Sequence, residues 1–328
     1  MGKRILEIKQ MRTSFRTSKG QVEAIRGIDL HVDEGEILGI VGESGSGKSV
    51  TMKSVMGLLP GYAKVESDGI FYKDVNLAEL SEKELQNYRG NEMAMIFQDP
   101  MTAMNPLRKV GYHLTQVIRR YKKCSKDEAV KLGIELLEHV GIPTPEARMK
   151  QYPHEFSGGM RQRALIAMAL SCEPSLLIAD EPTTALDVTI QAQILELLKK
   201  LHDERNMSIV IISHDMGVMA NMCDRIAVMY GGIIVEEGTV DEIFYHAKHP
   251  YTQALLCAIP HPEHDKSEKL CGIDGAPPSL YHLPKGCPFA ERCSYATEQC
   301  VNEMPEFQSY SETHKAKCFC DMSKDGGN

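Results

Sequence analysis

The chain has 328 residues, of which 42% are hydrophobic and 25% are charged, as in globular proteins with a sizeable core. The formal net charge of −8 argues against a broad nucleic-acid-binding face. No apolar run is long enough to span a bilayer, and the start MGKRILEIKQ lacks the apolar segment of a signal peptide. We therefore expect a cytoplasmic chain that reaches a membrane only through a partner.

The first part of the chain reads as strands followed by a loop and a helix. Three segments between residues 4 and 32, namely RILEI, QVEAI and IDLHV, alternate in polarity and predict strands. ILGIV at 37–41 is continuously apolar, which is typical of a buried parallel strand. A glycine-rich loop follows, and then a helical pattern from about Ser49 to Leu58.

The rest of the chain alternates between helical and strand patterns. Helical periodicity dominates 100–175 and predicts a helical subdomain inserted into an α/β core. LLIAD at 176–180 reads as a buried strand, a helix is expected at 188–205, and MSIVIIS at 207–213 is another strand. Two further strands flank a Gly-Gly turn near residue 231. This alternation predicts a mainly parallel sheet covered by helices on both faces.

The glycine-rich loop carries a phosphate-binding motif. GESGSGKS matches GxxxxGK[ST] and lies between a predicted strand and a predicted helix, which is the context that the motif requires. Backbone N–H groups and a helix N-terminus attract phosphate, while the lysine reaches the outer phosphates and the serine hydroxyl binds Mg²⁺. The predicted nucleotide-binding residues are Gly42, Ser44, Gly45, Ser46, Gly47, Lys48 and Ser49.

Two consecutive acidic residues lie at the end of the predicted strand at 176–180, one as its last residue and one directly after it. In phosphoryl-transfer sites an acid at this place supports Mg²⁺ through water, and a neighbouring acid orients or deprotonates the attacking water. We predict the first role for Asp180 and the second for Glu181. An ordinary surface Asp-Glu pair is the alternative, and the phosphate motif argues against it.

Further segments, in their order along the chain, resemble those of ATP-binding-cassette (ABC) ATPases. FSGGMRQR at 156–163 resembles the family signature, MIFQDP the Q-loop, TALD the D-loop and VIISHDM the segment with the switch histidine. The resemblance spans roughly 4–258. The signature departs from the usual pattern at Phe156 and Met160, which replace Leu and Gln, but its Ser-Gly-Gly centre is intact.

This resemblance implies a fold and a mode of assembly. The fold is a P-loop NTPase core with a mainly parallel sheet, an antiparallel β subdomain and a helical subdomain at about 100–175. Such ATPases close as dimers around ATP. Ser157, Gly158 and Gly159 would then face the γ-phosphate held by the partner's loop, and Asp187 would act across the dimer interface.

The resemblance also implies roles for Gln98, His214 and one aromatic residue. Gln98 would sense Mg²⁺ or water and link the site to a transporter, and His214 would contact the γ-phosphate. An aromatic residue near the N-terminus stacks on adenine in this family, which makes Phe15 the candidate. Packing as an ordinary core or turn residue is the alternative for Phe15.

The C-terminal part narrows the resemblance. HPYTQALL at 249–256 and CPFAERCSYATEQC at 287–300 resemble ATPase subunits of oligopeptide and dipeptide importers, whose close relatives import nickel. This implies a nucleotide-binding domain at 1–258 and a C-terminal extension at 259–328. The implied function is ATP hydrolysis that drives uptake of di- or oligopeptides, with nickel or a nickel chelate as the alternative cargo. A non-transport ABC ATPase is a further alternative, but the chain shows neither coiled-coil insertions nor tandem cassettes.

An importer of this kind implies partners. They are a second, homologous ATPase subunit, two transmembrane permease subunits and, indirectly, an extracytoplasmic substrate-binding protein, with no nucleic acid. The chain would then lie at the cytoplasmic face of the cell membrane.

Five of the ten cysteines lie near the C-terminus. The first four follow the pattern Cys287-x5-Cys293-x6-Cys300-x17-Cys318 and lack the tight C-x2-4-C pairs of zinc sites. In related importer ATPases this pattern resembles a [4Fe-4S] ligand set. Zinc and free thiols remain alternatives, as do Cys320 or His314 in place of Cys318 as the fourth ligand.

Overall fold

The computed structural model describes residues 2–184, 186–259, 272–281 and 283–320. The chain forms two compact units. Unit 1 consists of Met1–Lys3, Asp33–Gly35 and Glu79–Ile212, and unit 2 consists of Arg4–Val32, Glu36–Ala78 and Ser213–Asn328. The predicted boundary near 259 falls at the edge of residues 260–271, which lie outside the described residues.

An antiparallel sheet forms one part of unit 2. Its strands follow the order β2-β1-β5-β6, and a fifth strand, β4, pairs with β1. The two segments QVEAI and IDLHV belong to one strand, because Gly27 adopts φ 83° and lets the strand continue between them. The strands are β1 (Arg4–Thr17), β2 (Gly20–Asp33), β4 (Ala63–Glu66), β5 (Gly69–Tyr72) and β6 (Val75–Asn76).

A second sheet region of unit 2 carries the glycine-rich loop and the C-terminal extension. β3 (Ile37–Val41) is buried throughout, as predicted, and runs parallel to β10 (Arg225–Tyr230). β11 (Ile233–Thr239) continues antiparallel, and two short strands from the extension, β13 (Lys315–Ala316) and β12 (Gln308–Ser309), add to it. Sequence patterns did not predict that the extension continues this sheet.

Short helices complete unit 2. The first, α1 (Lys48–Val55), is shorter than the predicted helix at 49–58, because Gly57 takes the left-handed conformation that commonly terminates helices. The others are α9 (Met216–Met222), α10 (Val240–His246), α11 (Pro250–Cys257), α12 (Glu298–Asn302) and the 3-10 turn η3 (Ala290–Arg292). A further 3-10 turn, η1 (Leu77–Glu79), spans the boundary with unit 1.

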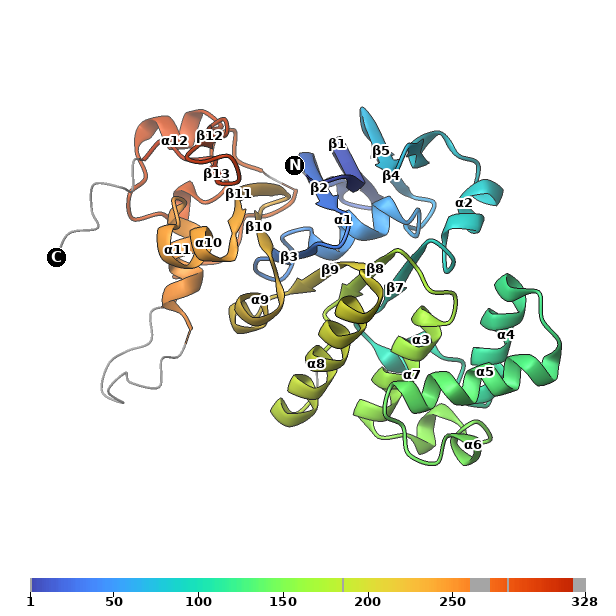
Figure 1. Ribbon diagram of the computed structural model, residues 1–328. Coiled ribbons are helices and arrows are strands. Elements are labelled where there is room, and N and C mark those ends of the chain that lie inside the picture. Colours follow the sequence, from blue (N-terminus) through green and yellow to red (C-terminus); the bar gives the residue numbers. More distant parts are fainter. Residues whose placement is uncertain (1, 185, 260–271, 282, 321–328) are drawn as a thin grey trace. The chain divides into compact units, whose positions relative to one another are not determined.

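Unit 1 combines parallel strands with most of the helices. β7 (Met93–Ile96), β8 (Leu176–Asp180) and β9 (Ser208–Ser213) pair in parallel, as the apolar runs predicted for the last two. Figure 1 shows the inserted helices grouped in green, where α4, α5 and α7 contact one another. The helices are α2 (Glu82–Tyr88), α3 (Pro100–Ala103), α4 (Val110–Lys122), α5 (Lys126–His139), α6 (Pro145–Arg148), η2 (Pro153–Glu155), α7 (Gly158–Leu170) and α8 (Val188–Arg205).

Within the described ranges, none of the helices is both long and apolar enough to cross a membrane.

Candidate functional site

The glycine-rich loop joins β3 to α1 in unit 2, and two of its glycines are required by close packing. A Cβ on Gly42 would lie 2.1 Å from the carbonyl oxygen of Met229. A Cβ on Gly47 would lie 2.7 Å from Ile25 and 2.9 Å from a backbone oxygen, and the residue has φ 107°. Only glycine fits these two positions, so the loop can keep its tight path from strand to helix.

The side chains of the loop suit an anionic ligand. Lys48 is 5% exposed, and its Nζ donates hydrogen bonds to the carbonyl oxygens of Gly42 at 2.6 Å and Glu43 at 2.9 Å. The Ser46 hydroxyl is buried and has no hydrogen-bond partner among the described residues. Ser44 and Gly45 are exposed at the tip of the loop, and Ser49 is half-buried in the first turn of α1. A phosphate group would supply the acceptor oxygens that these donors can use.

Glu43 forms hydrogen bonds through both its backbone and its side chain, although sequence analysis did not single it out. Its backbone N–H donates to the Tyr251 hydroxyl at 2.8 Å. Its carboxylate accepts hydrogen bonds from both terminal nitrogens of Arg292, at 2.7 and 2.9 Å. Glu43 occupies a variable position of the motif, where the pattern carries no information on residue type.

In unit 1, two of the three predicted catalytic residues, Gln98 and Glu181, are in contact. The Gln98 Nε2 donates to Glu181 Oε2 at 2.8 Å, and the Thr184 hydroxyl donates to the same oxygen at 2.8 Å. Glu181 has φ 48°, an uncommon conformation for a non-glycine residue, and its N–H donates to the carbonyl of Ile212. Asp180 is fully buried at the end of β8. Strained residues of this kind cluster at functional sites.

The signature and the D-loop segment pack against each other in unit 1. Ser157 caps α7 by accepting a hydrogen bond from Met160 N–H, and Asp187 caps α8 in the same way. A Cβ on Gly159 would lie 2.7 Å from Ile190, whereas one on Gly158 would lie 3.3 Å from Leu186. Gly159 therefore permits the close approach of α7 and α8. The D-loop residue Ala185 lies outside the described residues.

The exposure of these segments suits contact with other molecules. Ser157, Gly158 and Asp187 are exposed, while Phe156, which departs from the usual signature, is buried. Exposed glycine and serine at a helix N-terminus can admit an anionic group closely.

Two further predicted residues lie in unit 2. His214 is exposed immediately after β9. Phe15 is half-buried in β1 opposite Ala63, and its ring centroid lies 6.2 Å from that of Tyr62, which is 61% exposed. Tyr62 is thus a second aromatic residue beside the predicted adenine-stacking position, and no sequence motif pointed to it.

The C-terminal cysteines gather around one cavity in unit 2. Its volume is about 10 Å³, and the five thiols that line it belong to Cys287, Cys293, Cys300, Cys318 and Cys320. The pKa of Cys287 is raised to about 11 and that of Cys318 to about 12, chiefly by burial, with neighbouring thiols acting in the same direction and backbone hydrogen bonds opposing it. No group of three or more His, Cys, Asp or Glu side chains in the described part of the chain is already arranged to hold a metal ion. His314 is not part of this lining and instead pairs with the buried Glu236 at 2.8 Å.

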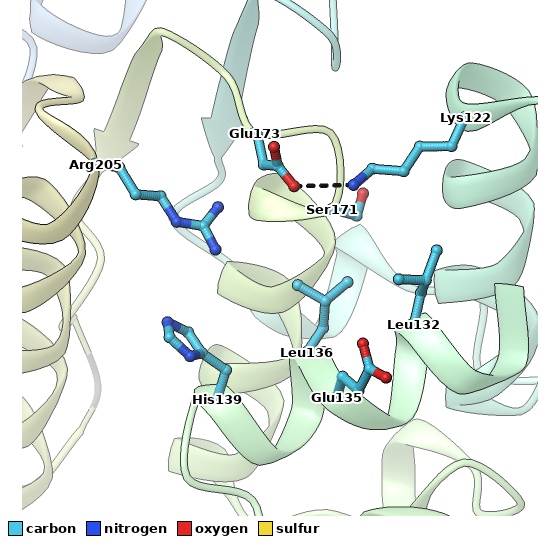
Figure 2. Close-up of a pocket in the computed structure, with 8 residues that line it drawn as sticks. All are labelled: Lys122, Leu132, Glu135, Leu136, His139, Ser171, Glu173 and Arg205. Atoms are coloured by element: carbon cyan, nitrogen blue, oxygen red, sulfur yellow. Dashed lines mark hydrogen bonds and ion pairs between the residues drawn. The ribbon is translucent and has the colours of Figure 1, made fainter. Parts of the chain in front are cut away.

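A larger cavity lies in unit 1, and none of the predicted site residues lines it. It has a volume of about 180 Å³ and is formed by α4, α5 and the ends of α7 and α8. Figure 2 shows Lys122 bound to Glu173, with Arg205 on the other side of Glu173. Because its lining mixes acidic and basic side chains, the cavity favours neither sign of ligand charge.

Comparisons with known proteins agree with this arrangement of motifs. Residues 25–184 match the family described as ABC transporter, and residues 235–300 match the one described as oligopeptide/dipeptide transporter, C-terminal region. The oligopeptide transport ATP-binding protein OppD of Bacillus subtilis (strain 168) is 56% identical, covering 96% of this chain and 88% of that protein. The dipeptide transport ATP-binding protein DppD of the same organism is 50% identical, covering 96% and 94%.

A solved structure supports the fold. The dimeric structure of MJ0796, a bacterial ABC transporter cassette, matches with a TM-score of 0.64 and 27% identity, covering 72% of this chain and 98% of that one. The core therefore has the ABC ATPase α/β fold, with a mixed sheet and an antiparallel β subdomain. Sequence identity of 50% or more with these two relatives, over 96% of the chain, shows that the chain belongs to the ABC transporter ATP-binding proteins of the oligopeptide/dipeptide transporter family.

Proposed function

We propose that this protein is the ATP-binding and ATP-hydrolysing subunit of an ABC importer that takes up di- or oligopeptides across the cytoplasmic membrane. The observation that carries the proposal is the match of residues 235–300 to the oligopeptide/dipeptide transporter C-terminal region, which lies in the same chain as the ABC transporter match. The names of the relatives at 56% and 50% identity support peptides as cargo rather than nickel.

The proposed chemistry divides among the predicted residues. The phosphate loop, with Lys48 and Ser49, binds the phosphates of ATP. The Ser49 hydroxyl and Asp180 would hold Mg²⁺, which would neutralise negative charge on the phosphates. Glu181 orients or deprotonates the attacking water. The hydrogen bonds from Gln98 and Thr184 support this role, because they fix the Glu181 carboxylate in one orientation. His214 contacts the γ-phosphate, and Phe15 or its neighbour Tyr62 stacks on adenine.

The proposed assembly follows from the exposed signature. Ser157, Gly158, Gly159 and Asp187 complete the site of a second, homologous ATPase subunit, and closure of that dimer moves two permease subunits. An extracytoplasmic binding protein delivers the peptide. The domains are a nucleotide-binding domain at 1–258 and an extension at 259–328, and the protein lies at the cytoplasmic face of the membrane.

We also propose that the extension holds a [4Fe-4S] cluster, with Cys287, Cys293, Cys300 and Cys318 as ligands. The support is the set of thiols around one cavity, because thiolates are the ligands of such clusters. Burial opposes thiolate formation there, so the charge of a bound cation is needed to stabilise the deprotonated form. Cys320, which lines the same cavity, is the alternative fourth ligand, and zinc is the alternative metal.

The transport proposal is tested by reconstitution. The chain is co-expressed with its permease subunits and the second ATPase, and ATP hydrolysis in liposomes is compared with peptide-loaded and nickel-loaded binding proteins. We expect stimulation by the peptide-loaded form, and loss of it in Glu181→Gln. Stimulation only by the nickel-loaded binding protein would show that nickel, and not peptide, is the cargo. Failure to copurify with any permease would contradict the importer function.

The cluster proposal has its own measurement. Iron, sulfide and zinc are quantified in anaerobically purified wild type, Cys300→Ser and the control Cys124→Ser, a free cysteine outside the cavity. We expect about four iron and four sulfide per chain in wild type and control, with a marked loss in Cys300→Ser. Zinc in place of iron would contradict the cluster.

A further inference from the structure

We propose that the C-terminal extension sets the ATP affinity of the phosphate loop through the ion pair between Arg292 and Glu43. Arg292 is then a positioning residue for nucleotide binding, although it lies 249 residues from the loop. This inference rests on the proposed ATP-binding role of the loop. It gives the extension a function that does not depend on whether its cysteines bind a metal cluster.

The ion pair between Arg292 and Glu43 is bidentate and largely buried on the Arg292 side, unlike an ordinary surface ion pair. Arg292 forms a two-pronged contact with the Glu43 carboxylate at 2.7 and 2.9 Å, and its side chain is only 6% exposed. Its remaining N–H groups donate to the Tyr230 hydroxyl at 3.0 Å and to the carbonyl oxygens of Asp274 and Ile273. A guanidinium with every direction engaged holds its partner in one place.

Glu43 passes this constraint to the phosphate-binding lysine. The carbonyl oxygen of Glu43 accepts a hydrogen bond from Lys48 Nζ at 2.9 Å, while its N–H donates to the Tyr251 hydroxyl. Tyr251 therefore holds the backbone of Glu43 while Arg292 holds its side chain, and both partners follow β11 in the chain. A shift of Glu43 would move the anchor of the Lys48 ammonium.

The aromatic side chains around Arg292 and Tyr251 form a rigid cluster. The rings of Tyr230, Tyr251 and Phe289 pack together with centroid separations of 4.5 to 5.3 Å. Phe289 and Arg292 both belong to the segment that begins at Cys287, so the extension contributes part of this aromatic cluster and the ion pair together. Three packed rings leave few alternative arrangements for the groups bonded to them.

Electrostatics give the pair its expected effect. A carboxylate in the phosphate loop repels the phosphates of ATP, and this repulsion is weakly screened because Glu43 is only 25% exposed. The Arg292 charge cancels that of Glu43. Loss of Arg292 alone should therefore weaken ATP binding, whereas loss of Glu43 alone should strengthen it.

The experiment measures the affinity of the full-length chain for a non-hydrolysable ATP analogue with Mg²⁺. The variants are Arg292→Gln, Glu43→Gln, the double variant, and the control Lys315→Gln, which removes an extension charge paired with Glu237 instead of the loop. We expect about tenfold weaker binding for R292Q, about twofold tighter binding for E43Q and a return to within about threefold of wild type for the double variant. K315Q should match wild type.

Three outcomes would overturn the inference. They are an unchanged affinity in R292Q, weakening in both single variants, and a double variant as weak as R292Q, since the last two would show that the contact itself, and not the cancelled charge of Glu43, governs nucleotide binding. If R292Q is less folded by circular dichroism, Arg292→Lys is measured instead, and because lysine keeps the charge we expect R292K to bind the analogue within about threefold of wild type. Binding by R292K about tenfold weaker than that of wild type would contradict charge compensation.

The assay separates this inference from the proposed function. It needs no permease, peptide or binding protein, so a failure of peptide import leaves the affinities unaffected. If the wild type does not bind the analogue at all, the ATP-binding role of the loop is refuted instead.

Discussion

The amide of Gln98 donates a hydrogen bond to the carboxylate of Glu181 at 2.8 Å, although 83 residues separate them. Thr184 donates to the same carboxylate oxygen, and the left-handed backbone of Glu181 turns the residue away from the line of β8. The side chain expected to act on water is thus held by two donors. This arrangement turns two separate sequence motifs into one structural unit and leads to the first two predictions.

Replacing Glu181 by Gln should abolish hydrolysis without preventing ATP binding. The substitution keeps the size of the side chain and one oxygen that can accept the hydrogen bonds from Gln98 and Thr184, but it removes the base, which is typically worth about 100-fold or more in kcat. Steady-state ATPase measurements, paired with analogue binding, check this. A variant that keeps more than about a tenth of the wild-type rate would exclude Glu181 as the base.

Replacing Gln98 by Ala should lower kcat by about tenfold with little change in ATP affinity, because the Glu181 carboxylate then loses the hydrogen bond from Gln98 that helps to orient it. The matched control is Gln86→Ala, which removes an exposed glutamine of the same unit that bonds to Glu82. Equal losses in both variants would mean that the effect is not specific to the Glu181 contact.

Replacing Gly42 by Ala should destroy the phosphate loop. The new methyl group would overlap the carbonyl oxygen of Met229 at 2.1 Å, which backbone atoms cannot relieve without moving β10. The matched control is Gly61→Ala, where nothing lies within 4 Å of the added carbon. We expect loss of analogue binding in G42A only, and normal binding in G42A would show that the loop tolerates a different path.

The two signature glycines should differ in how they tolerate alanine. A methyl group on Gly159 would press on Ile190 at 2.7 Å, so we expect G159A to lower the free energy of unfolding by about 1–3 kcal/mol. G158A should change it by less than about 1 kcal/mol, because the end of the Leu186 side chain, 3.3 Å away, needs to yield only slightly. Urea unfolding measures both, and Ile190→Ala should partly rescue G159A. A larger loss in G158A would contradict the packing argument.

Stability should depend on pH through Glu242, which joins α10 to the extension. Partial burial would raise the pKa of Glu242, but hydrogen bonds from Ser311, Thr239 and Thr313 outweigh it and lower the pKa to about 2. A carboxyl group with a lowered folded-state pKa stabilises the protein above its unfolded pKa, near 4.5, and loses this contribution as the pH falls towards 2.

Denaturant unfolding at several pH values tests this dependence. Between pH 5 and about 2, the free energy of unfolding of Glu242→Gln should fall less steeply than that of wild type. Above pH 5 the variant should be the less stable protein. Parallel pH profiles for the two proteins would contradict a role for Glu242.

Much of the fold was predictable because its signals are local. The buried strands at 37–41 and 176–180 were confirmed, since continuous apolar runs need no distant information to be recognised. Helix α5 begins at the capping box formed by Ser125 and Glu128, a signal that lies within four adjacent residues. The two strands predicted at QVEAI and IDLHV form the single strand β2, because Gly27 between them is accommodated within the strand.

The candidate site divides in the same way. The amino-acid sequence by itself determined the phosphate loop, the acidic pair after β8 and the signature, because each is a contiguous motif whose chemistry depends on neighbouring residues. Only the tertiary structure decided that Gln98 meets Glu181 and that Arg292 holds Glu43, and it also revealed that five cysteines share one cavity. These contacts join distant segments, and such pairings are selected by packing and burial over the whole unit, which no local pattern encodes.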